Sequence, residues 1–99
     1  MKTYTICGSM RFEKEMQKIA YDLERCKGYN ILQCVYGEKD YVPTEEELLR
    51  FAEAHYRKIE LSDGIYVVNI DGYIGASAKK EIEYAEKKVR KSYIVTMRR

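Results

Sequence analysis

A glycine-rich loop followed by a glutamate carries the clearest chemical signal in this sequence. Gly72 and Gly75 frame a Tyr-Ile pair, and Ser77 is a candidate N-cap for a helix that would carry Glu81. Because side chains on a helix lean toward its N-terminus, the Glu81 carboxylate could lie close to this loop. There it could attack the anomeric carbon of a sugar and form a covalent glycosyl-enzyme intermediate. The alternative is a surface glutamate that pairs with a basic residue one turn away.

A second loop, near the beginning of the chain, could bind an anion. Gly8 lets the backbone approach a ligand, Ser9 offers a hydroxyl, and Arg11 offers a charged guanidinium. In the alternative interpretation Gly8 makes a turn, Ser9 caps the following helix, and Arg11 is a solvated residue of its first turn.

Three residues around the glycine-rich loop could contact a substrate. Asn69 could bond loop backbone, a ribose hydroxyl or a base, and Asp71 could be a turn residue or a proton donor to a leaving base. Tyr73 could stack on a base. His55, in contrast, falls on or beside the buried face of a predicted helix, which favours a structural role.

Hydrophobic periodicity predicts the elements that would position these residues. Short β-rich runs alternate with segments whose apolar residues recur three and four apart, which is typical of amphipathic helices. Residues 44–47 form a capping box, and Gly28 is a natural helix stop. The predicted strands are Lys2–Cys7, Asn30–Tyr36, Ile65–Val68 and Ser92–Met97, and the predicted helices cover residues 12–26, 44–59 and 78–89, the last with Ala78, Ile82, Ala85 and Val89 on its buried face.

This alternation predicts an α/β fold of one domain over residues 1–99. We expect a flavodoxin-like or Rossmann-like three-layer sandwich, with a four-stranded parallel sheet of order 2-1-3-4 and helices on both faces. In that order the winding reverses between the first and third strands, and ligands bind at such a reversal beyond the carboxyl ends of the strands. The loops Gly8–Arg11 and Asn69–Ser77 are predicted to meet there.

Composition argues against several classes of protein. The 99 residues include 18 basic and 16 acidic side chains that are interspersed, which is not the pattern of a nucleic-acid-binding protein. No apolar run approaches the ~20 residues that span a bilayer, and no secretory signal is evident. The odd number of cysteines, with one histidine, predicts reduced thiols in the cytoplasm and no metal or other cofactor.

Two segments resemble the nucleoside 2-deoxyribosyltransferase superfamily. Ile6–Phe12 is similar to the Cys-Gly-Ser-x-Arg opening of the 2′-deoxynucleoside 5′-phosphate N-hydrolases, whose serine and arginine bind the 5′-phosphate. His55–Val95 resembles the family's unit of an aspartate, a hydrophobic strand, a glycine-rich loop and a helix with a nucleophilic glutamate, which falls on Glu81. The chain departs from the family at Glu83, where a glycine is usual, and at Asn69, where relatives place an acid.

The resemblance implies an enzyme that cleaves or exchanges the N-glycosidic bond of a (deoxy)nucleoside or its 5′-monophosphate, with Glu81 as nucleophile. Ser9, Arg11 and Ser77 would hold the phosphate or sugar, and Asn69 or Asp71 would orient sugar or base. A non-catalytic nucleotide-binding module that uses the same loops is the alternative. A homodimer or larger homo-oligomer is expected, because relatives complete their pockets across an interface.

Overall fold

A parallel β-sheet covered by helices forms the centre of the computed structural model, which describes residues 1–88 and the backbone of residues 91–97. The strands are β1 (Thr3–Cys7), β2 (Asn30–Leu32), β3 (Gly64–Ile70) and β4 (Lys91–Met97), hydrogen-bonded in the order β2-β1-β3-β4. The helices are α1 (Glu13–Asp22), α2 (Glu45–Glu60) and α3 (Ala76–Lys88). The α/β class with a parallel sheet is therefore confirmed, whereas Val89 lies outside the described residues.

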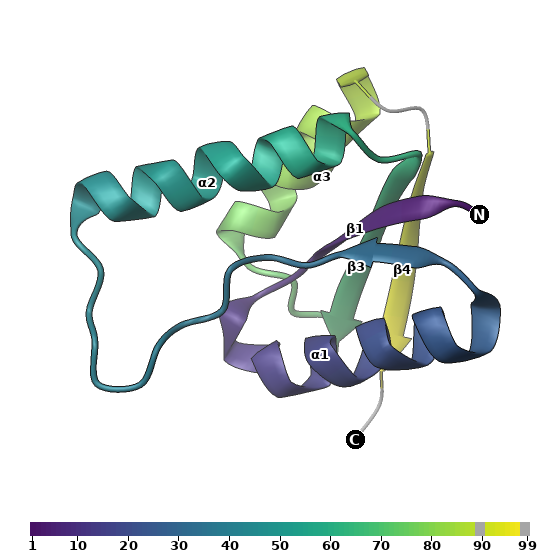
Figure 1. Ribbon diagram of the computed structural model, residues 1–99, viewed down its shortest axis with the longest axis horizontal. Coiled ribbons are helices and arrows are strands. Elements are labelled where there is room, and N and C mark those ends of the chain that lie inside the picture. Colours follow the sequence, from purple (N-terminus) through teal and green to yellow (C-terminus); the bar gives the residue numbers. More distant parts are fainter. Residues whose placement is uncertain (89–90, 98–99) are drawn as a thin grey trace.

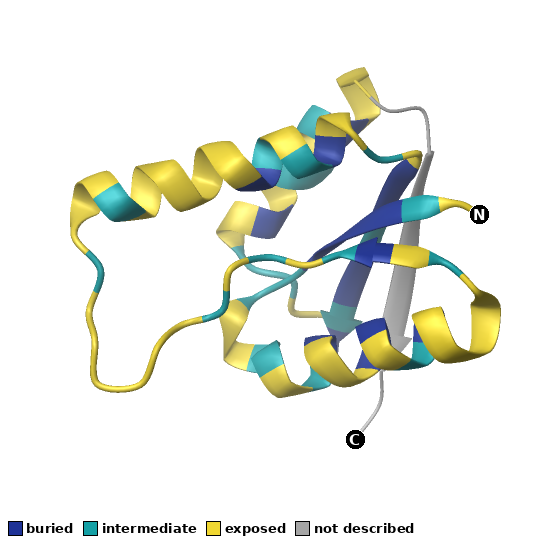
Figure 2. Ribbon diagram, in the orientation of Figure 1, coloured by how far each residue is buried: buried dark blue, intermediate teal, exposed yellow. Residues whose placement is uncertain are grey.

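Helices cover both faces of the sheet, as Figure 1 shows. On the face of the sheet that α1 covers, Met16 and Ile19 of this helix pack against Ile6 and Val68 of the strands. On the other face, a second core joins Ile59 of α2 and Ala85 of α3 to three strand residues, Cys7, Ile65 and Val67. Buried segments of the helices and strands are dark blue in Figure 2. Because successive residues of β3 point to opposite faces, one strand supplies both cores.

The beginning of α2 is well capped but little buried. The Thr44 hydroxyl accepts a hydrogen bond from the Glu47 backbone, and the Glu47 carboxylate accepts one from the Thr44 backbone, as the predicted capping box requires. Only His55 and Ile59 of this helix are buried, both in its second half. The first half of α2 therefore projects from the body of the molecule together with the loop before it (Figures 1 and 2).

Three local predictions differ from the structure: the length of the second strand, the N-cap of the third helix and, described in the next paragraph, the continuity of the first helix. The predicted second strand extended to Tyr36, but β2 ends at Leu32, and the Gln33 carbonyl accepts a hydrogen bond from Lys58 instead of from a strand. Ser77 was expected to cap α3, but the helix begins at Ala76, because the Gly75 carbonyl already accepts from the Lys79 backbone.

The predicted first helix, residues 12–26, divides into three consecutive parts. A 3₁₀ turn at Met10–Phe12 precedes α1, and a π-helical turn at Leu23–Lys27 follows it. Gly28 then ends the segment in the left-handed conformation, with φ of 70°, as its sequence position predicted.

In the part of the chain that the structure describes, no helix combines the length and the apolar character needed to cross a membrane.

Candidate active site

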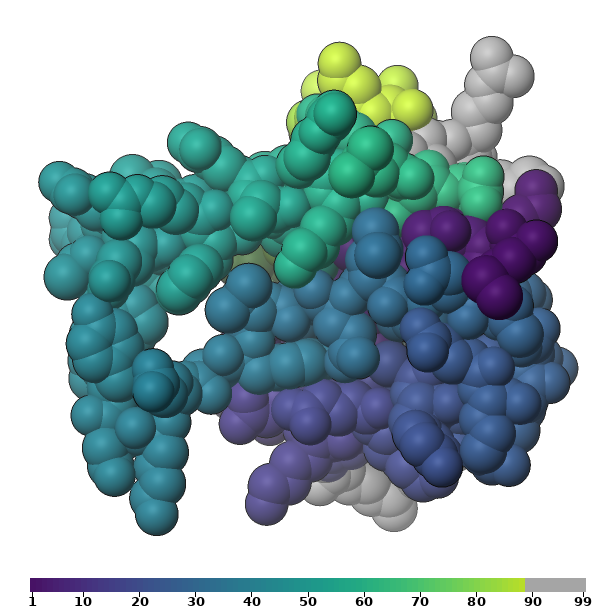
Figure 3. All heavy atoms as spheres, viewed as in Figure 1, coloured from purple at the N-terminus to yellow at the C-terminus, as the bar shows by residue number. Residues whose placement is uncertain are grey.

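A cavity of about 770 Å³ opens at the carboxyl end of β1, between α2, the beginning of α3 and the loop of residues 33–44. In Figure 3 the surface is hollowed where this loop and α2 stand away from the body of the molecule. Among the residues predicted to form a site, six line this cavity: Gly8, Ser9, Tyr73, Gly75, Ser77 and Glu81. The two loops expected at the reversal of the sheet therefore share one cavity with Glu81.

The two loops are in close contact. Gly75 has a φ of 85°, and a Cβ atom added there would lie 3.4 Å from the Cβ of Ser9. The Ser9 hydroxyl accepts a hydrogen bond from the Arg11 backbone and so caps the short turn that follows it. Ser9 therefore has the structural role that the alternative interpretation predicted, and it also lines the cavity.

Arg11 is not among the described residues that line the cavity. Its guanidinium carbon lies 4.4 Å from the centre of the Tyr73 ring, in the arrangement of a cation–π contact. The Arg11 side chain therefore packs on Tyr73, outside the described lining of the cavity where it was expected to hold a phosphate.

Asn69 and Asp71 do not line the cavity either, as far as the described residues show. Asp71, with φ of 52°, and Gly72, with φ of 82°, are the central residues of a tight turn in which Ile70 and Tyr73 exchange backbone hydrogen bonds. Asp71 is thus a turn residue, one of the two roles left open by the sequence. Asn69 is half-buried near the end of β3, and its Oδ1 atom has no hydrogen-bond partner among the described residues.

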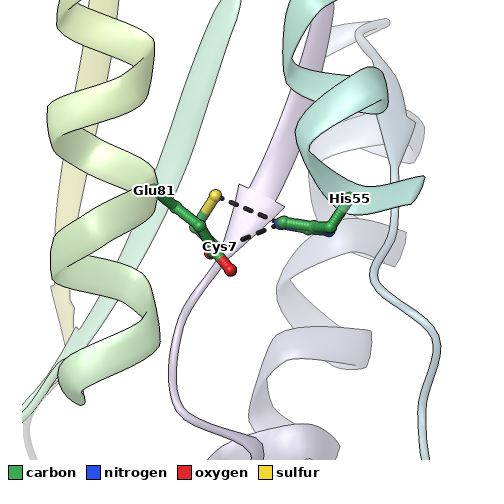
Figure 4. A group of neighbouring side chains, drawn as sticks. All are labelled: Cys7, His55 and Glu81. Carbon is green, nitrogen blue, oxygen red and sulfur yellow. Dashed lines mark hydrogen bonds and ion pairs between the residues drawn. The ribbon is translucent and has the colours of Figure 1, made fainter. Parts of the chain in front are cut away.

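Glu81 faces two side chains that the sequence did not single out as functional. His55 Nε2 lies 3.4 Å from Glu81 Oε1 and also 3.4 Å from the sulfur of Cys7. Figure 4 shows the three side chains converging from β1, α2 and α3. The side chains of His55 and Glu81 are only 7% and 16% exposed, yet all three residues line the cavity.

Packing between α2 and α3 holds this cluster in place. The Tyr84 hydroxyl donates a hydrogen bond to the Glu60 carboxylate, and the rings of Tyr56 and Tyr84 lie 4.8 Å apart. Because Tyr56 follows His55 on α2 and Tyr84 lies about one turn after Glu81 on α3, these contacts fix the distance between the imidazole and the carboxylate.

The sequence placed His55 on the buried face of its helix, which is confirmed, but its contact with Glu81 was missed. A histidine on an apolar face usually packs in a core, and the spacing of Cys7, His55 and Glu81 matches no local motif. The available signal was topological, because Cys7 ends β1 directly before the first predicted loop.

Burial raises the pKa of the Cys7 thiol well above its ordinary value, and the negative charge of Glu81 is the next largest cause. We predict that Cys7 reacts much more slowly than the exposed Cys26 with iodoacetamide at pH 7, since only the thiolate attacks and its fraction falls roughly tenfold for each unit of pKa. Peptide mass mapping over time measures the two rates. Equal rates at the two cysteines would contradict the buried, protonated thiol.

The charged residues of the cavity are acidic. Glu38, Glu47 and Glu81 line it, and no lysine or arginine does among the described residues. Hydrogen bonds from the Thr44 backbone and then from the Tyr41 hydroxyl lower the pKa of Glu47. The cavity therefore favours neutral or cationic ligands over anionic ones.

Comparisons with known proteins identify the fold. No family model matches the sequence, and no curated protein matches it significantly. Among solved structures, the chain is similar to a 2-desoxiribosyltransferase from Leishmania mexicana, with a TM-score of 0.63 and 17% sequence identity over 99% of this chain. The alignment covers 65% of the Leishmania protein, so this chain spans about two thirds of its length. The chain therefore has a nucleoside 2-deoxyribosyltransferase-like fold.

Proposed function

We propose that this protein cleaves or exchanges the N-glycosidic bond of a (deoxy)nucleoside, with Glu81 as the nucleophile. The observation that carries the proposal is that Glu81 lines the same cavity as the two loops at the reversal of the sheet. The likeness of the fold to a deoxyribosyltransferase supports glycosyl transfer as the class of reaction. Residual exposure of the carboxylate leaves it accessible from the cavity.

The reaction would proceed in two displacements at the anomeric carbon. A Glu81 oxygen donates an electron pair to C1′ while the bond from C1′ to the base nitrogen breaks, and the leaving base takes up a proton from solvent in the cavity. Water or a second base then attacks C1′ from the opposite side and releases Glu81. Water gives hydrolysis and a second base gives transfer. We assign no step to Asn69 or Asp71, which lie outside the cavity.

An uncharged nucleoside fits this cavity better than a 5′-monophosphate. Binding a phosphate commonly requires a cationic side chain, and the described residues that line the cavity supply none. Arg11, the cation expected for this purpose, packs on Tyr73 instead. Tyr73, Phe51 and Tyr36 line the cavity and offer rings on which a neutral base could stack.

The direct test is to incubate the purified protein with deoxynucleosides, ribonucleosides and their 5′-monophosphates and to measure free base by chromatography. We expect base release from nucleosides, with lower kcat/KM for monophosphates. Adding a second base distinguishes transfer, which yields a new nucleoside, from hydrolysis. Failure to release base from any member of this panel would contradict the proposed activity.

Ligand binding without turnover is the second candidate function. It is favoured by one observation, namely that the two polar residues expected to assist Glu81, Asn69 and Asp71, do not line the cavity. A pure binding module would be stabilised against heat by nucleosides while releasing no base. An enzyme would show both effects.

We also propose that the projecting part of α2 and its preceding loop mediate self-association. Val42 is 88% exposed and Leu49 is 65% exposed, and neither lines the cavity. We predict that the double variant Val42→Asp/Leu49→Asp is monomeric by light scattering, whereas the wild type is a dimer or larger, because burial of these side chains favours association. Leu61→Asp is the matched control, as Leu61 is 62% exposed at the other end of α2. A monomeric wild type would contradict the prediction.

A further inference from the structure

We propose that Cys7, His55 and Glu81 form a binding site for Zn²⁺ with three protein ligands. A thiolate, an imidazole nitrogen and a carboxylate oxygen are the three donor types that zinc uses in proteins. The sequence predicted no metal because the cysteines and the single histidine are far apart in the chain. The fold nevertheless brings these three side chains together from β1, α2 and α3 (Figure 4).

Two of the three distances between the donor atoms match a tetrahedral zinc site. Zinc–ligand bonds of about 2.0–2.3 Å place tetrahedral ligands about 3.3–3.6 Å apart. The distance from His55 Nε2 to Cys7 Sγ is 3.4 Å, and the distance from His55 Nε2 to Glu81 Oε1 is also 3.4 Å. All three donor atoms lie within 4.8 Å of one another. A zinc ion could thus be bound with small side-chain adjustments.

The site has room for a fourth ligand. Cys7, His55 and Glu81 all line the cavity, so a water molecule or a ligand oxygen can complete the tetrahedron from that side. Structural zinc sites have four protein ligands, whereas a site with three protein ligands keeps one position open for water or another small ligand. The mixed sulfur and nitrogen donors favour zinc over Mg²⁺ or Ca²⁺, which prefer oxygen ligands.

The charges around the cluster favour a cation. Glu38 and Glu47 also line the cavity, and none of its described lining residues is a lysine or arginine.

On binding, the Cys7 thiol gives its proton to solvent and an electron pair of the thiolate bonds to the metal, while His55 binds through Nε2 and carries its proton on Nδ1. His55 Nδ1 has no hydrogen-bond partner among the described residues. A hydrogen-bond partner on the second nitrogen of a zinc-binding histidine typically strengthens metal binding about 10–100-fold. Because His55 lacks such a partner among the described residues, we expect the bound zinc ion to exchange readily.

Zinc at this position would occupy the Glu81 carboxylate and block its attack on a sugar. This consequence, unlike the metal site itself, rests on the proposed function. Zinc should therefore inhibit base release, and chelation by EDTA should restore it. Binding is measured independently of activity, so the two proposals can fail separately.

The test titrates untagged protein with Co²⁺, a spectroscopic substitute for zinc, and follows the sulfur-to-cobalt charge-transfer absorption. We expect saturation at one equivalent for the wild type and for Cys26→Ser, and displacement of the signal by Zn²⁺. The charge-transfer band should be lost in Cys7→Ser, and His55→Gln should bind at least about tenfold more weakly. Persistence of the band in Cys7→Ser, or its loss in Cys26→Ser, would overturn the site.

A second measurement needs no variant and so does not depend on correct folding of Cys7→Ser. Alkylation by iodoacetamide is followed here at about pH 9, where more of the buried Cys7 thiol is ionised and its slow reaction becomes measurable. Zinc should lower this rate at Cys7 of the wild type and leave the rate at Cys26 unchanged. Equal rates at Cys7 with and without zinc would contradict the proposal. If cobalt binds as expected but no base is released from any nucleoside, the metal site stands and the proposed function fails.

Discussion

Replacing Glu81 by Gln should lower the rate of base release about 1,000-fold or more, with little change in stability. The amide has nearly the size of the carboxylate but cannot donate the electron pair that forms the bond to C1′. Loss of a nucleophile typically removes most of the catalysed rate and leaves only the contribution of binding. The measurement is kcat/KM for base release, together with the midpoint of thermal unfolding.

Glu83→Gln is the matched control for this substitution. Glu83 lies on the same helix, two residues further along, and is exposed outside the cavity. The same chemical change there should leave the rate within about twofold of the wild type, because exposed charges rarely affect a distant site strongly. A similar loss in both variants, or none in Glu81→Gln, would contradict the assignment of Glu81 as nucleophile.

Replacing Gly75 by Val should separate the two loops and weaken nucleoside binding roughly tenfold, equivalent to about 1.4 kcal/mol. Gly75 has a φ of 85°, and a Cβ atom there would already lie 3.4 Å from Ser9 Cβ. The additional methyl groups of valine would have to push Ser9 and its loop away. A left-handed conformation also costs a residue with a side chain roughly 1–2 kcal/mol, so the variant should be less stable.

Gly72→Val separates these two effects. Gly72 has a φ of 82°, but a Cβ atom there would meet nothing within 4 Å. Both variants should lose unfolding free energy in urea, Gly75→Val the more because of its contact with Ser9, while only Gly75→Val should show the weaker binding, measured by calorimetry with a nucleoside. Equal affinities in the two variants would show that contact between the loops at Ser9 does not shape the site.

The sequence predicted the arrangement of the sheet and helices because hydrophobic periodicity determines which faces are buried. In α1 the apolar residues three and four apart do pack against the sheet, and in β3 a continuous apolar run is buried on both faces. The Thr44 cap and the Gly28 stop also followed from local chemistry, because their partners lie within a few residues along the chain.

Contacts between distant segments could not be predicted in the same way. The meeting of Cys7, His55 and Glu81 depends on how α2 and α3 pack together, and Tyr56, Tyr84 and Glu60 contribute to that packing. No spacing in the sequence contains this information.

The position of Arg11 depends on side-chain packing in a similar way. Its guanidinium packs on the ring of Tyr73, which lies in a loop more than sixty residues further along the chain. The early end of β2 likewise depends on a hydrogen bond from Lys58 in α2 to the Gln33 carbonyl. The sequence therefore identified the two loops but not which of their side chains line the cavity.

The two proposals for Glu81 share one physical basis. A carboxylate that is largely buried, faces an acidic cavity and lies near a histidine and a cysteine can attack an electrophilic carbon or bind a cation. A single residue cannot do both at once. Zinc binding and glycosyl transfer are therefore expected to compete in solution.

The central claim is a covalent bond between Glu81 and the sugar, and mass spectrometry of the trapped intermediate tests it most directly. A 2′-fluorinated nucleoside slows both displacements, since fluorine destabilises the oxocarbenium-like transition states, and it can let the intermediate accumulate. We predict a mass increase of one fluorinated sugar on the peptide that contains Glu81, and no such increase in Glu81→Gln. A sugar attached to a different residue, or base release from the fluorinated nucleoside with no adduct on the protein, would contradict the account.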